Sequence, residues 1–142
     1  GLKYNRSLGA AVKAFRTSEA YLNRTEAYLQ KALAGDPSTV QLALRDLNQL
    51  RSNRITTANY QDLTLTDPVA LYTFYQSERR RELCFEDQRW FDLRRWNLSV
   101  THSLQLSSAV TETVTLQPGD DRFTLPIPQS ALLVNPDLVP NP

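Results

Sequence analysis

The sequence predicts a mainly α-helical protein with one small β-hairpin and a proline-rich tail. Three observations support this fold class. Apolar residues recur at helical spacing over residues 14–51. Asp-Pro pairs stand at 36–37 and 67–68, where helices would begin. After residue 97 the pattern changes to short runs rich in Val, Thr and Leu, which are typical of strands.

The first predicted element is a helical hairpin over residues 14–51. The buried stripe of its first helix consists of Phe15, Leu22, Leu29 and Leu33, with Tyr21 and Tyr28 beside it. Gly35 fits a C-terminal cap, and Asp36 and Pro37 fit the start of a second helix. The buried face of that second helix consists of Val40, Ala43, Leu44 and Leu47. So short a connection predicts two antiparallel helices.

The junction of this hairpin, residues 28–37 (YLQKALAGDP), is also similar to the end of a tetratricopeptide unit. Such units stack into surfaces that bind other proteins. A helical-repeat interaction module and an ordinary helical hairpin are therefore both open interpretations of residues 14–51.

The middle of the chain predicts a loop followed by a long charged helix. Residues 52–66 are polar and rich in threonine, which is typical of a connection. Asp67 and Pro68 repeat the cap-plus-proline pattern and begin a helix that we expect over residues 68–97.

The remainder, residues 98–142, predicts short strands and a wrapping tail. Strands are expected at 100–106 and 111–116, a turn at 118–121 and a third strand at 122–125. Most of the eight prolines follow residue 117. The tail still carries apolar side chains, namely Leu125, Ile127, Leu132, Leu133 and Leu138. We therefore expect the tail to wrap across the body and to be held there by its leucines.

The charged helix places ionisable and apolar side chains on the same face. Sorting residues 78–96 (ERRRELCFEDQRWFDLRRW) at 100° per residue puts six charges beside the apolar residues: Glu78, Arg79, Glu82, Glu86, Arg89 and Asp92. Unpaired charge on a core-facing surface costs several kcal/mol per ion. Arginine can bind a carboxylate bidentately, and residues at i,i+3 are close on a helix. These six residues are predicted to form a structural ion-pair network.

Several functional classes are disfavoured by the same residues. Glu82 and Glu86 resemble the acid and base of a glycosidase, but the neighbouring arginines would hold both ionised, so we predict no catalytic residue. Trp90 and Trp96 share the apolar half, which favours burial over sugar stacking. One Cys (Cys84) and one His (His102) support neither a metal site nor a cofactor. A net charge of +1, with local balance of acids and arginines, argues against nucleic acid.

The charged segment resembles the signature helix of the SusD/RagB family, which is roughly E-R-R-x-E-L-x-F-E-G-x-R-W-x-D-L-R-R-W. Residues 78–96 follow this pattern except at Asp87, where the family usually has glycine. Residues 15–28 and 43–54 resemble two helices of the same family, with Thr25 in place of an alanine. The tail resembles the family's ending, P-I-P-x-x-E-x-x-x-N-P-x-L-x-Q-N-P, with Ala131 and Pro140 as departures. The resemblance spans residues 14–142, in the family's order.

This resemblance implies a non-enzymatic, SusD-like binding protein. Family members are lipid-anchored on the outer face of the bacterial outer membrane. They cover a TonB-dependent transporter, of the SusC-like kind, and capture oligosaccharides or, in some members, peptides. The resemblance places residues 1–142 as a single C-terminal domain or fragment, with signal peptide and anchor expected upstream. The family's ligand contacts lie in variable loops, so no ligand-binding residue is carried over. We expect this chain to be mainly scaffold.

Overall fold

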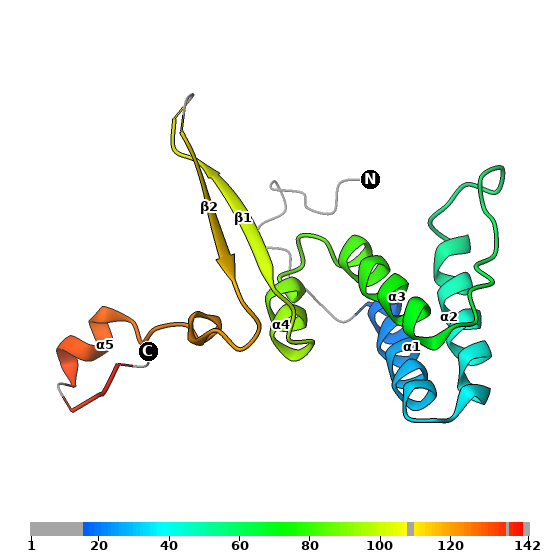
Figure 1. The fold of residues 1–142 in the computed structure, drawn as a ribbon, viewed down its shortest axis with the longest axis horizontal. Helices are drawn as coiled ribbons and strands as arrows, with labels where there is room; N and C mark the ends of the chain where they lie inside the picture. The colour runs from blue at the N-terminus through cyan, green and yellow to red at the C-terminus, as the bar shows by residue number, and fades with distance from the viewer. Residues whose placement is uncertain (1–15, 108–109, 136, 141–142) are drawn as a thin grey trace. The chain divides into compact units, whose positions relative to one another are not determined.

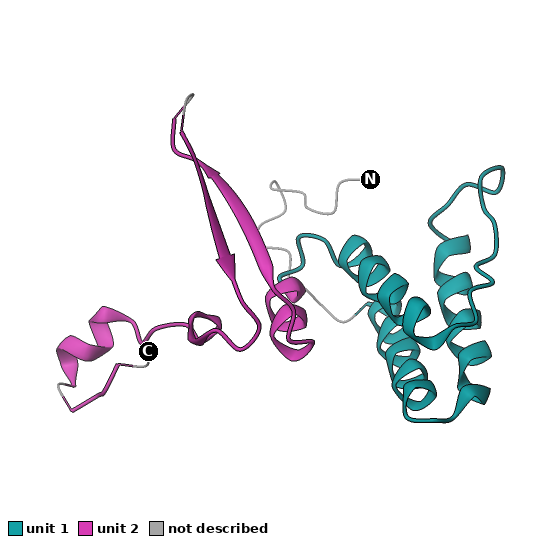
Figure 2. Ribbon diagram, in the orientation of Figure 1, with its two compact units in different colours: residues 1–87 teal, residues 88–142 magenta. Residues whose placement is uncertain are grey.

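The computed structural model describes residues 16–107, 110–135 and 137–140. These residues are mainly helical and include a two-stranded antiparallel sheet, which confirms the predicted fold class (Figure 1). Phe15, from the predicted stripe, lies outside the described residues. The chain divides into two compact units, residues 1–87 and residues 88–142 (Figure 2).

The first unit is built from α1 (Thr17–Leu33), α2 (Val40–Ser52) and α3 (Pro68–Glu82). Helix α1 packs against both α2 and α3. The Thr39 hydroxyl donates to the Tyr28 carbonyl, and Arg24 pairs with Asp46, so residue numbers run in opposite directions in α1 and α2. The predicted antiparallel helical hairpin is therefore confirmed.

The helix ends follow the predicted capping residues. Gly35 has a φ of 106° and closes α1, where its N–H donates to the Ala32 carbonyl at 3.1 Å. Glycine adopts this left-handed conformation without steric cost. Asp36 then accepts from the Ser38 N–H, at the start of a 3-10 turn (Pro37–Thr39) that leads into α2. Asp67 accepts from the Ala70 N–H at 2.7 Å and begins α3.

The core of the first unit lies where α1 meets α2 and α3. Its fully buried apolar side chains are Leu22, Leu29, Ala43, Leu47, Leu71 and Tyr75. The predicted stripe is correct at Leu22 and Leu29, but Leu33 is 42% exposed. Leu33 is the last residue of α1, beside the capping turn at Gly35, so the helix ends before that side chain can be covered. All four residues predicted on the inner face of α2 are buried.

The charged segment is not one helix, so the prediction of a continuous helix over 68–97 was wrong. Helix α3 ends at Glu82, residues 83–87 form a turn, and α4 (Gln88–Arg95) follows. Phe85 and Asp87 have φ values of 64° and 59°, in the left-handed region that an α-helix of L-residues does not enter. Asp87 stands where the resembled pattern has glycine, the residue best suited to this conformation.

The second unit contains α4, the hairpin and the tail. Strands β1 (Val100–Gln105) and β2 (Thr111–Leu116) pair antiparallel, with Val100 opposite Leu116, as the sequence predicts. A third strand at 122–125 is not formed, and a 3-10 turn (Asp121–Phe123) stands there instead. Asp120 caps that turn by accepting from the Arg122 N–H at 2.9 Å, which explains the difference.

The second unit buries few apolar side chains. Leu93 and Phe123 are buried, and the Trp90 and Phe123 rings lie 5.1 Å apart. The tail forms a short helix, α5 (Gln129–Val134), which buries no residue. Leu125, Leu133 and Leu138 are exposed, so the prediction that leucines hold the tail was wrong for these three. Local hydrogen bonds to the Pro128 carbonyl form α5 without covering its apolar face.

Candidate functional site in the charged segment

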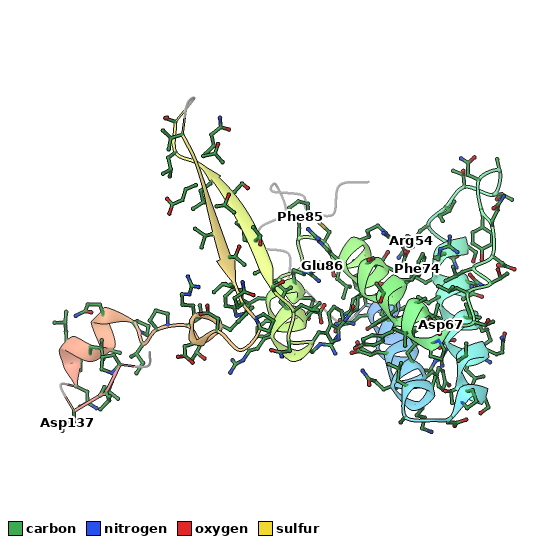
Figure 3. All side chains as sticks on the ribbon, viewed as in Figure 1. Arg54, Asp67, Phe74, Phe85, Glu86 and Asp137 are labelled. Carbon is green, nitrogen blue, oxygen red and sulfur yellow. The ribbon has the colours of Figure 1, made fainter. Side chains whose placement is uncertain are left out.

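The six charges expected on the inner face are all at least partly covered. Arg79, Glu82 and Asp92 are buried, and Glu78, Glu86 and Arg89 have intermediate exposure. On the opposite half of the expected helix, Gln88 has intermediate exposure and the other residues are exposed, namely Arg80, Arg81, Cys84, Asp87, Phe91, Arg94 and Arg95. Sorting by helical face therefore separated the buried charges from the exposed ones, although the helix is interrupted. Phe85 falls on the same half as the six charges by helical spacing, but it lies in the turn and its side chain is exposed (Figure 3).

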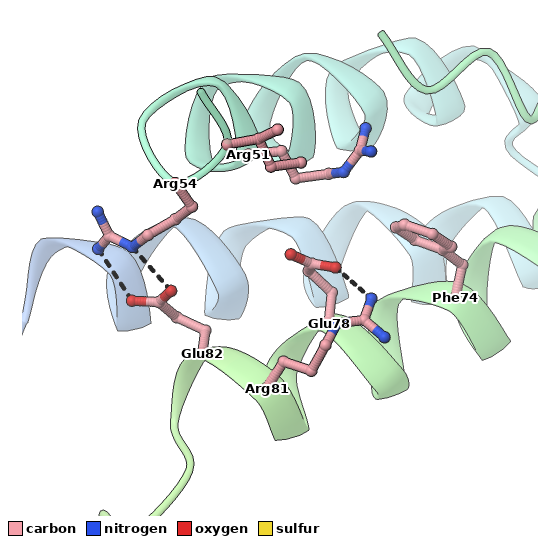
Figure 4. A pocket seen from close by; sticks show the side chains of 7 residues that line it. Arg51, Arg54, Phe74, Glu78, Arg81 and Glu82 are labelled. Atoms are coloured by element: carbon pink, nitrogen blue, oxygen red, sulfur yellow. Dashed lines mark hydrogen bonds and ion pairs between the residues drawn. The ribbon is translucent and has the colours of Figure 1, made fainter. Parts of the chain in front are cut away.

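Glu82 is the centre of the charge arrangement in the first unit. Arg54, just after α2, donates from Nε to Oε2 and from Nη2 to Oε1, both at 2.9 Å (Figure 4). Arg16, just before α1, also pairs with Glu82 and bridges to Glu86 in the turn. We refer to Arg16, Arg54, Glu82 and Glu86 as the Glu82 cluster. It connects the start of α1, the end of α2 and the end of α3.

The electrostatics of the cluster favour an ionised Glu82. Burial opposes ionisation, but the hydrogen bonds and charge of Arg54 outweigh it, and the charge of Arg16 adds to them. The pKa of Glu82 is therefore below its ordinary value. The same hydrogen bond to Glu82 raises the pKa of Arg54. A general acid needs a raised carboxyl pKa at neutral pH, so this arrangement is unsuited to proton donation by Glu82.

The other predicted charges have partners of several kinds. Glu78 pairs with Arg81 on the same helix, and Asp92 pairs with Arg95 on α4 at 2.9 Å. Arg79 donates to Asn23 on α1 at 2.8 Å. Glu86 lies in the turn between α3 and α4, where it pairs with Arg16.

Sequence reasoning missed Arg54, Arg16 and the ion pair between the exposed Arg24 and the buried Asp46. Asp46 is almost fully buried on α2 and accepts from Arg24 Nε at 2.5 Å and Nη2 at 2.9 Å. The charge and hydrogen bonds of Asp46 raise the pKa of Arg24. Two signals were available in the sequence: Asp46 lies between Ala43 and Leu47 on the apolar face, and Arg54 ends one of the matched family segments.

A cleft of about 400 Å³ lies beside the Glu82 cluster (Figure 4). Its walls are Arg51, Arg54, Ile55, Phe74, Glu78, Arg81 and Glu82. The Arg51 guanidinium lies 5.6 Å from the centre of the Phe74 ring, and that of Arg81 lies 5.8 Å from it. Arg51 also lies 5.9 Å from the Tyr60 ring and donates to the Gln61 carbonyl at 3.1 Å.

The remaining candidate residues carry no further chemistry in this geometry. Trp90 and Trp96 have intermediate exposure, and the Arg95 guanidinium lies 4.5 Å from the Trp96 ring centre. The expected burial of both tryptophans is thus met only in part. Cys84 and His102 are exposed. Within residues 16–107, 110–135 and 137–140, no group of three or more His, Cys, Asp or Glu side chains is arranged to hold a metal ion. None of the helices in these same ranges combines the length and apolar character needed to cross a membrane.

Comparison with known proteins identifies a family. The model of the SusD family matches residues 3–142. No curated protein and no solved structure matches the chain.

Proposed function

Because the chain belongs to the SusD family, we propose that it is part of a glycan-binding lipoprotein on the outer-membrane surface that works with a TonB-dependent transporter. At the level of the family, SusD proteins bind nutrients, are not enzymes, are found at the outer-membrane surface and pair with such transporters. The observation that carries the proposal is the family match over almost the whole chain.

Within that protein, we propose that this chain is mainly scaffold. The Glu82 cluster supports this role, because one buried carboxylate connects the starts or ends of three helices. Its arginines keep the carboxylate ionised, which suits a structural ion pair and not an acid catalyst. The interaction-module alternative for residues 14–51 has less support, because the family match runs over residues 3–142 and not over the hairpin alone.

A panel of oligosaccharides and peptides tests this function. The whole lipoprotein that contains this chain is screened on the panel, each hit is measured by calorimetry, and the recovered ligand is analysed by chromatography. The expected result is saturable binding of one glycan class, with the ligand recovered unchanged. Binding of peptides alone would move the proposal to peptide uptake. Hydrolysis of the ligand, or no binding to either class, would contradict it.

A further inference from the structure

The cleft beside the Glu82 cluster has one arginine whose charge is not balanced by an acid. Arg54 pairs with Glu82 and Arg81 pairs with Glu78. Arg51, by contrast, pairs with no carboxylate in the part of the chain that the structure describes. Its hydrogen bonds go to the Asn48 side chain and the Gln61 carbonyl. Three arginines against two glutamates leave the cleft walls with a net charge of +1.

The guanidinium group of Arg51 also has hydrogen-bond donors available for a ligand. Both of its hydrogen bonds come from Nη1. The guanidinium carbon lies 5.6 Å from the centre of the Phe74 ring and 5.9 Å from that of the Tyr60 ring, within the range of cation–π attraction. The edge formed by Nε and Nη2 has no hydrogen-bond partner in the described ranges. This is the same edge through which Arg54 binds Glu82 and Arg24 binds Asp46, each time bidentately.

The charge and walls of the cleft indicate a class of ligand. A single positive charge is matched by a monoanionic carboxylate, whereas a doubly charged phosphate would leave negative charge beside Glu78 and Glu82. The volume of about 400 Å³ is within the range of small-molecule sites. Ile55 offers apolar contact to the C–H groups of a ring, and the glutamate oxygens can accept hydrogen bonds from hydroxyl groups.

We propose that this cleft binds the carboxylate of an acidic sugar, a uronate unit of an oligosaccharide, through the Nε–Nη2 edge of Arg51. This inference rests on the proposed function, because it takes the nutrient to be a glycan. It assigns to the scaffold a contact that selects acidic over neutral sugars.

Calorimetry with trigalacturonate and with its neutral methyl ester tests the proposal on the 142-residue chain. The acid should bind at least about tenfold more tightly than the ester, because only the acid forms the charge-assisted pair. Arg51→Gln should remove this preference. Arg45→Gln, an exposed arginine of the same helix outside the cleft, is the charge-matched control and should keep it. Circular dichroism establishes that each variant is folded.

The outcomes separate this inference from the proposed function. Equal binding of acid and ester, no binding of either, or equal weakening by both variants would overturn the carboxylate site. Equally tight binding of a glutamate-containing peptide would overturn the assignment to sugars. If Arg51→Gln does not fold, NMR of the wild-type arginine Nε–H signals decides, because only the Arg51 signal should shift with the acid. Neutral glycan binding that is insensitive to Arg51→Gln would leave the proposed function standing and this inference overturned.

Discussion

Replacing Glu82 with glutamine tests the structural role of the Glu82 cluster. The change keeps the size of the side chain but removes its charge, leaving Arg54 and Arg16 around a neutral amide. Hydrogen bonds to charged groups contribute roughly 1.5–3 kcal/mol. Breaking a fully buried pair costs more, about 3–5 kcal/mol. The Glu82 side chain is 8% exposed but that of Arg54 is 47% exposed, so solvent screening places the expected loss nearer the lower range.

We therefore expect Glu82→Gln to lower the free energy of unfolding by about 2 kcal/mol at pH 7. For a chain of this size that is a fall in Tm of about 4–8 °C, measured by circular dichroism. The loss should depend on pH. The pKa of Glu82 is lowered in the folded state, so its stabilisation is present above the unfolded pKa of about 4.3 and is lost as pH falls through the folded pKa.

The pH series has a matched control in Glu112→Gln, the same chemical change at an exposed position of β2. Glu112→Gln should change the Tm very little at any pH. The difference between wild type and Glu82→Gln should be constant from pH 7 to pH 5 and shrink below about pH 4. A loss under about 0.5 kcal/mol at pH 7, or a loss that does not change with pH, would refute the structural role of this ion pair.

Three further pairs of substitutions test other parts of the fold by urea denaturation. Asp67→Ala removes the N-cap of α3 and should cost about 1 kcal/mol, most of which Asp67→Ser should restore; equal losses would contradict the capping role. Leu47→Ala should cost about 2–5 kcal/mol, because the side chain is fully buried, whereas Leu33→Ala should cost much less. Asp87→Gly should leave stability unchanged or raise it, and Asp87→Val should lower it by at least about 1 kcal/mol, since β-branched residues are disfavoured at positive φ; the reverse order would rule out the left-handed turn.

The sequence predicts the first unit well because local and tertiary signals agree there. Asp67 caps α3, and Asp36 caps the 3-10 turn that leads into α2, as the Asp-Pro pairs predict. The buried faces of α1 and α2 follow the 3.6-residue period. The break at residues 83–87 was missed because helical periodicity continues across it. The departure at Asp87 from a glycine pattern was the available signal, since glycine in a family pattern often marks a positive φ.

Long-range partners could not be read from spacing along one helix. The burial of Glu82 was predictable from its face, but its partners Arg54 and Arg16 come from segments 28 and 66 residues away. Contacts of this range depend on how α1, α2 and α3 pack. The prediction for the tail failed for a related reason. Its leucines indicate that apolar surface must be covered, but composition does not show which part of the protein would cover it. Leu133 is exposed.

Affinity capture from outer membranes is the most direct test of the proposed function. The protein is tagged in cells that express it, the outer membranes are solubilised in mild detergent after crosslinking, and captured proteins are identified by mass spectrometry. The account predicts that a TonB-dependent transporter is recovered in an amount close to that of the tagged protein. Recovery of the tagged protein from another cell fraction, or from outer membranes without any such transporter, would contradict it.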